Sequence, residues 1–302
     1  MKLSVNIAGV EWKNPVTTGS GAVNSGKEYT PYIDVNRLGA ITSKGVSLEE
    51  WKGNVVPRVT ETYGGILSSI GVQNPGVLEF IKSDIAFFQK INTTVIVNIC
   101  GHTVKEYAQV AEKLSQETGI DMLELNISSP SVTAGGMEFG TSRQKTEEVI
   151  KEVKKVTKLP VIVKLSPNVT DIIEISKASE ASGADALSMI NSVLAMRIDI
   201  NRRKPVLGST IGGLSGPAIK SIGVRCVYQA YKSVKIPIIG MGGIMNSDDA
   251  IEYMMAGATA VAVGTANFAN PRSTIDIING IEKYLEKTGI EDINEIIGCA
   301  HM

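Results

Sequence analysis

The side chains that could do chemistry recur at the ends of short apolar segments. The clearest case is segment 123–131, in which leucine and isoleucine alternate with polar residues before a Ser-Ser-Pro-Ser sequence. The alternation predicts a strand, and proline among small hydroxyl residues predicts that a loop follows it. The amide of Asn126 and the hydroxyls of Ser128 and Ser129 therefore fall at the carboxyl end of a strand. Side chains in that position commonly bind or react with a small molecule.

Seven further apolar segments end in the same way. Their tips carry small or polar residues, namely Ser20, Lys44, Asn98, Lys164, Asn191, Gly242–Gly243 and Gly264–Thr265. Glycines after the last two segments let backbone N–H groups approach a phosphate, although they could also serve only to make tight turns. Lysines suit a flat ring that gains negative charge on reduction, and asparagines offer donors and acceptors to its edges. Flavin mononucleotide (FMN) is the natural candidate ligand.

The segments alternate with helical patterns, which predicts an α/β fold. The eight segments are 15–21, 39–45, 94–99, 123–131, 160–167, 186–191, 237–243 and 260–265. Helices are expected at 103–119, 171–183 and 247–257, the last with Ser247 as its N-cap. Eight such strands in this length predict a (β/α)8 TIM barrel, taken as one FMN-binding domain over residues 1–302.

Three other features bear on the architecture. Residues 3–15 alternate apolar and polar residues and predict a hairpin that closes the bottom of the barrel. The long loops 45–76 and 192–216 are expected on the catalytic face. A doubly wound sheet is the alternative fold, but it requires a third glycine of the dinucleotide fingerprint where Asn24 stands.

Composition excludes several classes of function. The net charge of −1 gives no basic field for nucleic acid or an acidic membrane. Apolar runs fall short of the roughly 20 residues that span a bilayer, and the N-terminus has no signal-peptide pattern. Three separated cysteines and two histidines argue against a metal site, and the odd thiol count favours a reducing cytoplasm.

Six segments together carry a family resemblance. They are 69–76 (SIGVQNPG), 124–128 (ELNIS), 163–170 (VKLSPNVT), 212–218 (GGLSGPA), 238–243 (IIGMGG) and 261–268 (VAVGTANF). Along nearly its whole length the chain resembles the catalytic subunits of class 1B dihydroorotate dehydrogenases. The resemblance implies an FMN barrel that oxidises (S)-dihydroorotate to orotate in pyrimidine biosynthesis, with hydride passing from C6 to flavin N5. It also implies a homodimer, and a partner subunit with FAD and a [2Fe-2S] cluster that completes a heterotetramer and reduces NAD.

The resemblance also implies site residues. The positions that match the FMN contacts of the family are Ser20, Lys44, Asn98, Asn126, Lys164, Ile190, Gly216, Gly242, Gly243, Gly264 and Thr265. The positions that match its substrate contacts are Lys44, Ser68, Ser69, Ile70, Gly71, Val72, Asn126, Ser131, Asn191 and Ser192. In this scheme Lys164 stabilises the anionic reduced flavin, and Ser129 takes the C5 proton.

The substrate side departs from the pattern of the family. Ser129 stands where class 1B has a cysteine base, Ser68 and Ser131 stand where the family has asparagines, and Ser192 replaces a threonine. A thiol has a pKa of about 8.5, whereas a serine hydroxyl is a far weaker base, although class 2 members of the family do use serine. Two alternatives therefore stay open. One is a paralogue that acts on another small unsaturated ring or acid, and the other is a catalytically silent FMN-binding protein.

Overall fold

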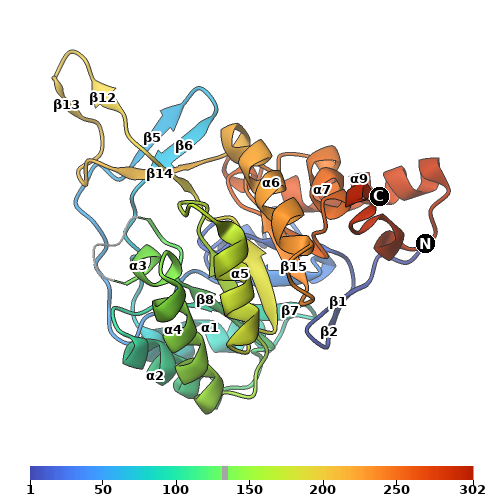
Figure 1. Cartoon of the computed structure of the whole chain (residues 1–302), viewed down its shortest axis with the longest axis horizontal. Coiled ribbons are helices and arrows are strands. Elements are labelled where there is room, and N and C mark those ends of the chain that lie inside the picture. The colour runs from blue at the N-terminus through green and yellow to red at the C-terminus, as the bar shows by residue number, and fades with distance from the viewer. Residues whose placement is uncertain (131–134, 302) are drawn as a thin grey trace.

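Eight parallel strands form the central sheet of the computed structural model, which describes residues 1–130 and 135–301 (Figure 1). In chain order they are β3 (Val16–Thr18), β4 (Ala40–Thr42), β7 (Thr94–Ile99), β8 (Met122–Asn126), β9 (Val161–Leu165), β10 (Ala186–Met189), β15 (Ile238–Met241) and β16 (Ala260–Val263). Each lies within or overlaps one predicted segment. Their order in the sheet is β3-β16-β15-β10-β9-β8-β7-β4. The predicted (β/α)8 barrel is thereby confirmed.

Threonine side chains join the two end strands of this order, β3 and β4. The Thr42 amide donates to Thr18 Oγ1 at 3.0 Å, and Thr18 Oγ1 donates to the Thr42 carbonyl at 3.4 Å. The hydroxyls of Thr17 and Thr42 lie 3.3 Å apart. All three residues are buried, so these contacts satisfy polar groups at the seam of the barrel.

Helices surround the barrel, as the alternating pattern predicts. They are α1 (Val77–Phe88), α2 (Val104–Leu114), α3 (Met137–Gly140), α4 (Arg143–Val156), α5 (Ile172–Ala181), α6 (Lys220–Tyr231), α7 (Ser247–Met255), α8 (Ala266–Ala269) and α9 (Ser273–Thr288). Short 3-10 helices cover η1 (Lys27–Tyr29), η2 (Val35–Arg37), η3 (Pro217–Ile219), η4 (Ile293–Ile296) and η5 (Cys299–His301). In α2 the buried Tyr107, Val110, Ala111 and Leu114 form one apolar stripe.

The start of α7 differs by one residue from the prediction. Asn246, not Ser247, is the N-cap, and its side chain accepts from the Asp249 amide at 3.0 Å. Asn246 has extended backbone angles that aim its side chain at the first turn, whereas Ser247 is already helical. The predicted N-terminal hairpin is present as β1 (Val5–Ile7) paired antiparallel with β2 (Val10–Trp12).

The two predicted catalytic-face loops contain strands, which corrects the expectation of irregular chain there. The first holds β5 (Val59–Thr62) and β6 (Gly65–Ser68), and the second holds β11 (Val193–Ala195), β12 (Ile198–Asp199), β13 (Lys204–Pro205) and β14 (Gly212–Ser215). β6 pairs antiparallel with β14, which completes a four-stranded sheet in the order β11-β14-β6-β5. Such pairing between distant segments leaves little local signal in a sequence.

Candidate active site

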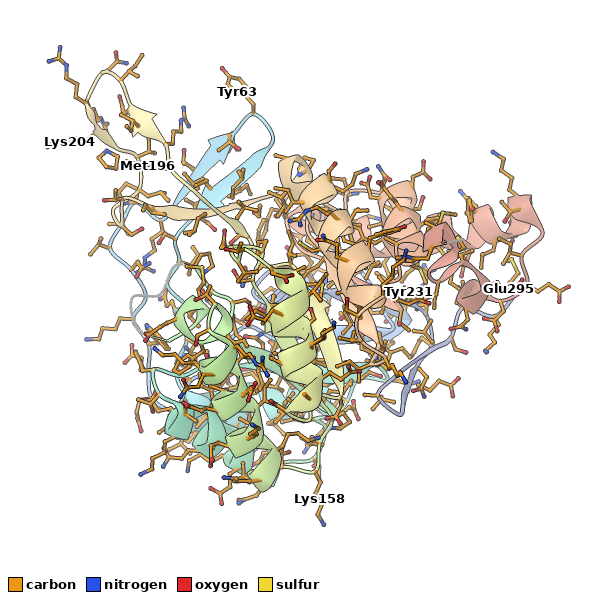
Figure 2. All side chains as sticks on the ribbon, in the orientation of Figure 1. Tyr63, Lys158, Met196, Lys204, Tyr231 and Glu295 are labelled. Carbon is orange, nitrogen blue, oxygen red and sulfur yellow. The ribbon has the colours of Figure 1, made fainter. Side chains whose placement is uncertain are left out.

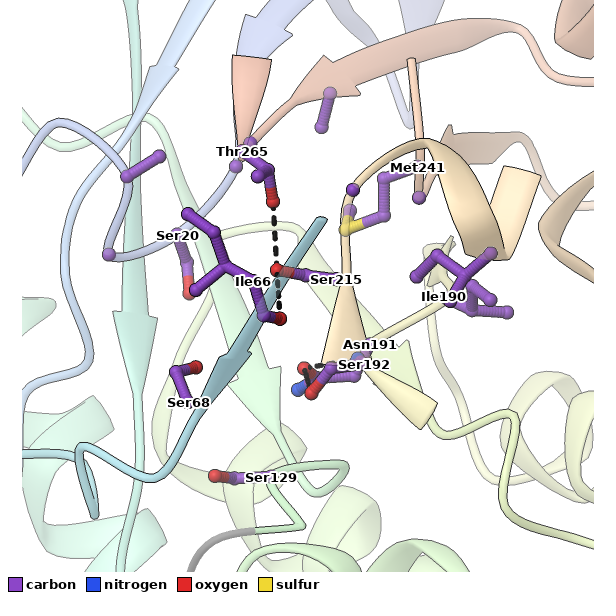
Figure 3. Close-up of a pocket in the computed structure, with 18 of the residues that line it drawn as sticks. Ser20, Ile66, Ser68, Ser129, Ile190, Asn191, Ser192, Ser215, Met241 and Thr265 are labelled. Atoms are coloured by element: carbon purple, nitrogen blue, oxygen red, sulfur yellow. Dashed lines mark hydrogen bonds between the residues drawn. The ribbon is translucent and has the colours of Figure 1, made fainter. Parts of the chain in front are cut away.

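A cavity of about 650 Å³ opens at the carboxyl ends of the barrel strands (Figure 3). The barrel contributes its polar tips, and the four-stranded sheet contributes Val59, Ile66, Ser68 and Ser215 as an opposite wall. The two long segments predicted for the catalytic face therefore do lie at the mouth of the barrel. This arrangement encloses a ligand between a rigid strand platform and a cover.

Most of the predicted residues meet in this cavity. The predicted FMN contacts that line it are Ser20, Lys44, Asn126, Lys164, Ile190, Gly216, Gly242, Gly243, Gly264 and Thr265. The predicted substrate contacts that line it are Lys44, Ser68, Ile70, Val72, Asn126, Asn191 and Ser192, and Ser129 lies there as well. Asn98, Ser69 and Gly71 are not among the lining residues. Ser131 lies outside the described residues.

The glycine-rich end of the cavity has a backbone that side chains would obstruct. Gly216, Gly242 and Gly243 adopt positive φ angles of 98°, 116° and 73°. An added Cβ at Gly243 would lie 2.8 Å from the Lys220 amide nitrogen, which is too close. An added Cβ at Gly264 would meet no atom within 4 Å, so it would occupy free space beside the chain. Glycines with these backbone angles let an anion approach the main chain closely, so these residues fit the phosphate of a mononucleotide.

Two amides of the cavity belong to a buried hydrogen-bond chain. Asn191 Nδ2 donates to Ser128 Oγ at 3.0 Å, and Ser128 Oγ donates to Asn126 Oδ1 at 3.4 Å. Asn126 Nδ2 lies 3.4 Å from Asn98 Oδ1, and the Tyr107 hydroxyl donates to the Asn126 carbonyl at 2.8 Å. Asn98 thus supports Asn126 from behind. The chain fixes the orientation of the two amides that face a ligand.

The chain ends on a buried carboxylate that was not predicted as a site residue. Asn98 Nδ2 donates to Glu124 Oε1 at 2.6 Å, and Ser188 Oγ donates to Glu124 Oε2 at 2.7 Å. The Lys164 ammonium lies 3.7 Å from Glu124 Oε1. A signal was present in the sequence, because residues i and i+2 of a strand share a face, which puts Glu124 on the side of Asn126.

The backbone at one wall of the cavity is strained. Val72 has a φ of 53°, which is unusual for a β-branched side chain, and the preceding Gly71 has a φ of 71°. Val72 lines the cavity, as Lys44 does. A β-branched residue held in this conformation at a cavity wall is a common mark of a functional site.

Comparison with known proteins agrees with this geometry. A family model described as dihydroorotate dehydrogenase matches residues 2–285. The chain belongs to the dihydroorotate dehydrogenase family.

Curated relatives are similar over their full lengths. The chain is 57% identical to the dihydroorotate dehydrogenase B (NAD(+)) catalytic subunit of Alkaliphilus oremlandii, over 98% of each chain. It is also 57% identical to the protein of that name from Lachnoclostridium phytofermentans, over 99% of each. A solved dihydroorotate dehydrogenase from Eimeria tenella, in complex with ferulenol, has a TM-score of 0.83 at 22% identity, covering 99% of this chain and 89% of that one. That likeness concerns the fold.

Membership confirms the class 1B resemblance and the expected class of enzyme. The chain is a dihydroorotate dehydrogenase-type flavoprotein, an oxidoreductase of CH–CH bonds. The described helices include none that is long and apolar enough to cross a membrane. A cytoplasmic location stays a prediction.

Among the cavity residues that the sequence did not predict, Ser215 links the dehydrogenase barrel to its cover. Thr265 Oγ1 donates to Ser215 Oγ at 2.9 Å, and Ser215 Oγ donates to the Ile66 carbonyl at 3.4 Å (Figure 3). Ser215 directly precedes Gly216, so its position in the matched segment 212–218 was the available signal. The pair ties the glycine-rich end of the cavity to β14 and β6.

Lys44, which lines the cavity, is electrostatically perturbed. Burial, and to a lesser degree the nearby Arg58 guanidinium, lower the pKa of Lys44 below its ordinary value. Cys100, which follows β7, is buried, and burial raises the pKa of its thiol. It does not line the cavity, so its position argues for packing rather than catalysis. Across residues 1–130 and 135–301, no group of three or more His, Cys, Asp or Glu could hold a metal ion.

Proposed function

We propose that this chain is the FMN-containing catalytic subunit of a class 1B dihydroorotate dehydrogenase, built as one barrel domain over residues 1–302. It oxidises (S)-dihydroorotate to orotate in pyrimidine biosynthesis. The observation that carries the proposal is that the phosphate-suited glycines, Lys164, Ser129 and the paired amides Asn126 and Asn191 all line one cavity.

The chain offers FMN two kinds of contact. Backbone amides around Gly242, Gly243 and Gly264, with the Thr265 hydroxyl, would hold the phosphate. Lys164 and Asn126, which are paired across neighbouring strands β9 and β8, would face the ring. When bound, FMN supplies the two-electron acceptor for the oxidation. The lysine stabilises the negative charge that a reduced flavin carries.

The substrate would lie against Asn126 and Asn191, whose amides match the polar edges of orotate. Lys44 would supply a positive charge for the carboxylate, and Val72, whose φ of 53° is strained, lines the same cavity. Ile70 and Val72 line this end, and Ser69 is fixed behind it by a hydrogen bond from Asn54 Nδ2 to its hydroxyl at 2.7 Å. Ser192, Ser68 and Ser131 complete the proposed substrate set.

Ser129 is the proposed base. Its side chain lines the cavity and is almost fully buried, with 7% of its surface exposed. Its backbone carbonyl accepts from the Met137 amide at 3.0 Å, which anchors the chain that follows β8. Because a serine hydroxyl is a weak base, removal of the C5 proton requires an onward acceptor for that proton.

The relatives bear the name catalytic subunit, which supports a partner chain. We propose that this partner carries FAD and a [2Fe-2S] cluster, passes electrons to NAD, and completes a heterotetramer with two copies of this chain.

Exposed apolar side chains support the proposed homodimer of this chain. Tyr63 lies at the tip of β5–β6 and is fully exposed. Ile200 lies at the tip of β12–β13 and is 82% exposed, and Met196 is 47% exposed. Tyr63 and Met196 lie on hairpins that project beyond the barrel (Figure 2).

A second candidate function is favoured by the serines of the pocket. Ser68 and Ser129 line the cavity where the family has an asparagine and a cysteine. Unpaired polar groups of bound orotate would cost about 1–3 kcal/mol each. The chain would then be a paralogue that acts on another small unsaturated ring or acid. A protein that binds FMN without turnover is the third possibility.

An anaerobic titration separates these functions. The purified yellow protein is titrated with dihydroorotate while the flavin absorbance is followed, and dithionite serves as the control reductant. Rapid bleaching that is lost in Ser129→Ala supports the proposal. No bleaching in protein that dithionite reduces normally contradicts the dihydroorotate assignment. Bleaching by another ring substrate then identifies a paralogue. If no organic substrate bleaches the flavin, the chain is a catalytically silent FMN-binding protein.

A further inference from the structure

A buried acidic residue lies beneath the cavity, where barrels usually hold apolar side chains. The Glu124 side chain is 4% exposed and the Lys164 side chain 6% exposed, and the two charged groups are 3.7 Å apart. Strand register fixes this placement. Lys164 is paired with Asn126 on one side and Ser188 on the other, and Glu124 precedes Asn126 by two residues on the same face.

The Glu124 carboxylate accepts its hydrogen bonds from neutral donors rather than from Lys164. Asn98 donates to Oε1 at 2.6 Å and Ser188 donates to Oε2 at 2.7 Å. Both are short, well-formed hydrogen bonds, whereas the 3.7 Å to the ammonium exceeds hydrogen-bond range. The Glu124 carboxylate is therefore close enough to compensate the charge of the Lys164 ammonium. Lys164 lines the cavity, and its N–H donors remain available there.

We propose that Glu124 is a positioning residue that keeps Lys164 protonated and its donors directed at the flavin. This inference rests on the proposed binding of FMN. Burial disfavours a lone ammonium, and an oxidised, neutral flavin ring gives it no compensating charge. The Glu124 carboxylate supplies that charge in the oxidised protein, so the lysine is already cationic when the ring is reduced.

Other charges near Lys164 must be accounted for. Lys44, on the loop after β4, lines the same cavity. The neighbouring strand β10 contains no titratable residue, and β8 contributes Glu124 alone. Since Lys44 is retained in every variant below, differences between the variants report on the Glu124–Lys164 pair.

The test measures protons taken up per two electrons, from the pH dependence of the FMN midpoint potential in dye-equilibrated anaerobic titrations. Glu124→Gln keeps the shape and can still accept from Asn98 while its amide donates to Ser188. We expect wild type to take up about one proton, which goes to the ring, and Glu124→Gln about two, because a neutral Lys164 is then protonated on reduction. At a pH at which the reduced ring is anionic even without the lysine, Glu124→Gln/Lys164→Met returns to about one.

A matched control is Ser188→Ala, which removes one hydrogen bond but no charge and keeps the wild-type proton count. An unchanged count in folded, FMN-loaded Glu124→Gln overturns the proposal, since a merely structural carboxylate would not alter it. If Glu124→Gln does not fold, recovery of folded protein in the double variant supports the pairing, and failure of both contradicts it. The FMN content of the wild-type protein is measured separately. Wild-type protein that binds no FMN would overturn the proposed function rather than the role of Glu124.

Discussion

The Tyr253 hydroxyl donates a hydrogen bond to the Gly242 carbonyl at 2.7 Å, from within the core behind the glycine-rich end of the cavity. It lies 3.1 Å from the Met241 carbonyl as well. An added Cβ at Gly223 would come within 1.8 Å of this hydroxyl, so α6 leaves room for it only because that residue is glycine. A side chain of α7 thereby fixes the backbone that would hold a phosphate.

Tyr253→Phe should weaken FMN binding. The substitution keeps the ring but leaves a buried carbonyl without its donor, at a cost of about 1–3 kcal/mol that is shared between folding and FMN binding. FMN dissociation is measured by fluorescence on dilution, and we expect the dissociation constant to rise several-fold. Tyr284→Phe, on α9, is the matched control and should bind FMN like wild type. Equal FMN affinity in Tyr253→Phe would show that the glycine turn needs no such support.

Ser68→Asn should tighten orotate binding if dihydroorotate is the substrate. Ser68 ends β6, lines the cavity and is opposite Gly213 of β14, where a longer amide can reach a ligand. Pairing one buried polar edge of orotate is expected to gain about tenfold in affinity, or ~1.4 kcal/mol. Orotate titrations of the flavin spectrum measure this, with the exposed Ser221→Asn on α6 as control. Weaker binding in Ser68→Asn would instead favour a pocket built for a different ligand.

Orotate affinity should fall at alkaline pH because of Lys44. Burial and Arg58 lower the pKa of Lys44 below 10.5, and a bound carboxylate favours its charged form. Below the lowered pKa the lysine is charged in both states, so affinity is maximal and independent of pH. Above it, binding must take up a proton, and affinity falls by up to about tenfold per pH unit. Titrations from neutral pH up to pH 10.5, the ordinary pKa of a lysine, cover this window.

The control for this pH dependence is Lys44→Met, which should bind orotate more weakly and with a flat profile over the same range. A wild-type affinity that stays constant through the window would mean that Lys44 does not contact the carboxylate. A decline that persists in Lys44→Met would assign the titration to another group.

Ile200→Asp should convert a homodimer into monomers. Ile200 is 82% exposed at the β12–β13 turn, and a carboxylate there would be desolvated without a partner in an apolar interface. Light scattering coupled to size-exclusion chromatography gives the mass. Leu78→Asp, on the exposed side of α1, is the control and should remain dimeric. Wild-type protein that is itself monomeric would contradict the homodimer, and a dimeric Ile200→Asp would move the interface elsewhere.

The sequence by itself determined the barrel and the glycine-rich end of its cavity. The eight strands and the N-terminal hairpin are local patterns, because strand and turn preferences depend on neighbouring residues. The sequence predicted that polar side chains at the strand ends, such as Lys44, Asn126 and Lys164, converge, because parallel strands in a barrel present their carboxyl ends on one face. Family motifs then indicated the flavin.

Only the tertiary structure decided how these tips are covered and supported. The pairing of Ile66 with Ser215 joins segments about 150 residues apart, so no local window contains the signal for the four-stranded sheet. The structure likewise placed Asn98 behind Asn126 rather than at the cavity surface, and brought Glu124 to Lys164. Contacts between side chains on different strands depend on register around the closed barrel, and that register is set by packing of the whole fold rather than by any one segment.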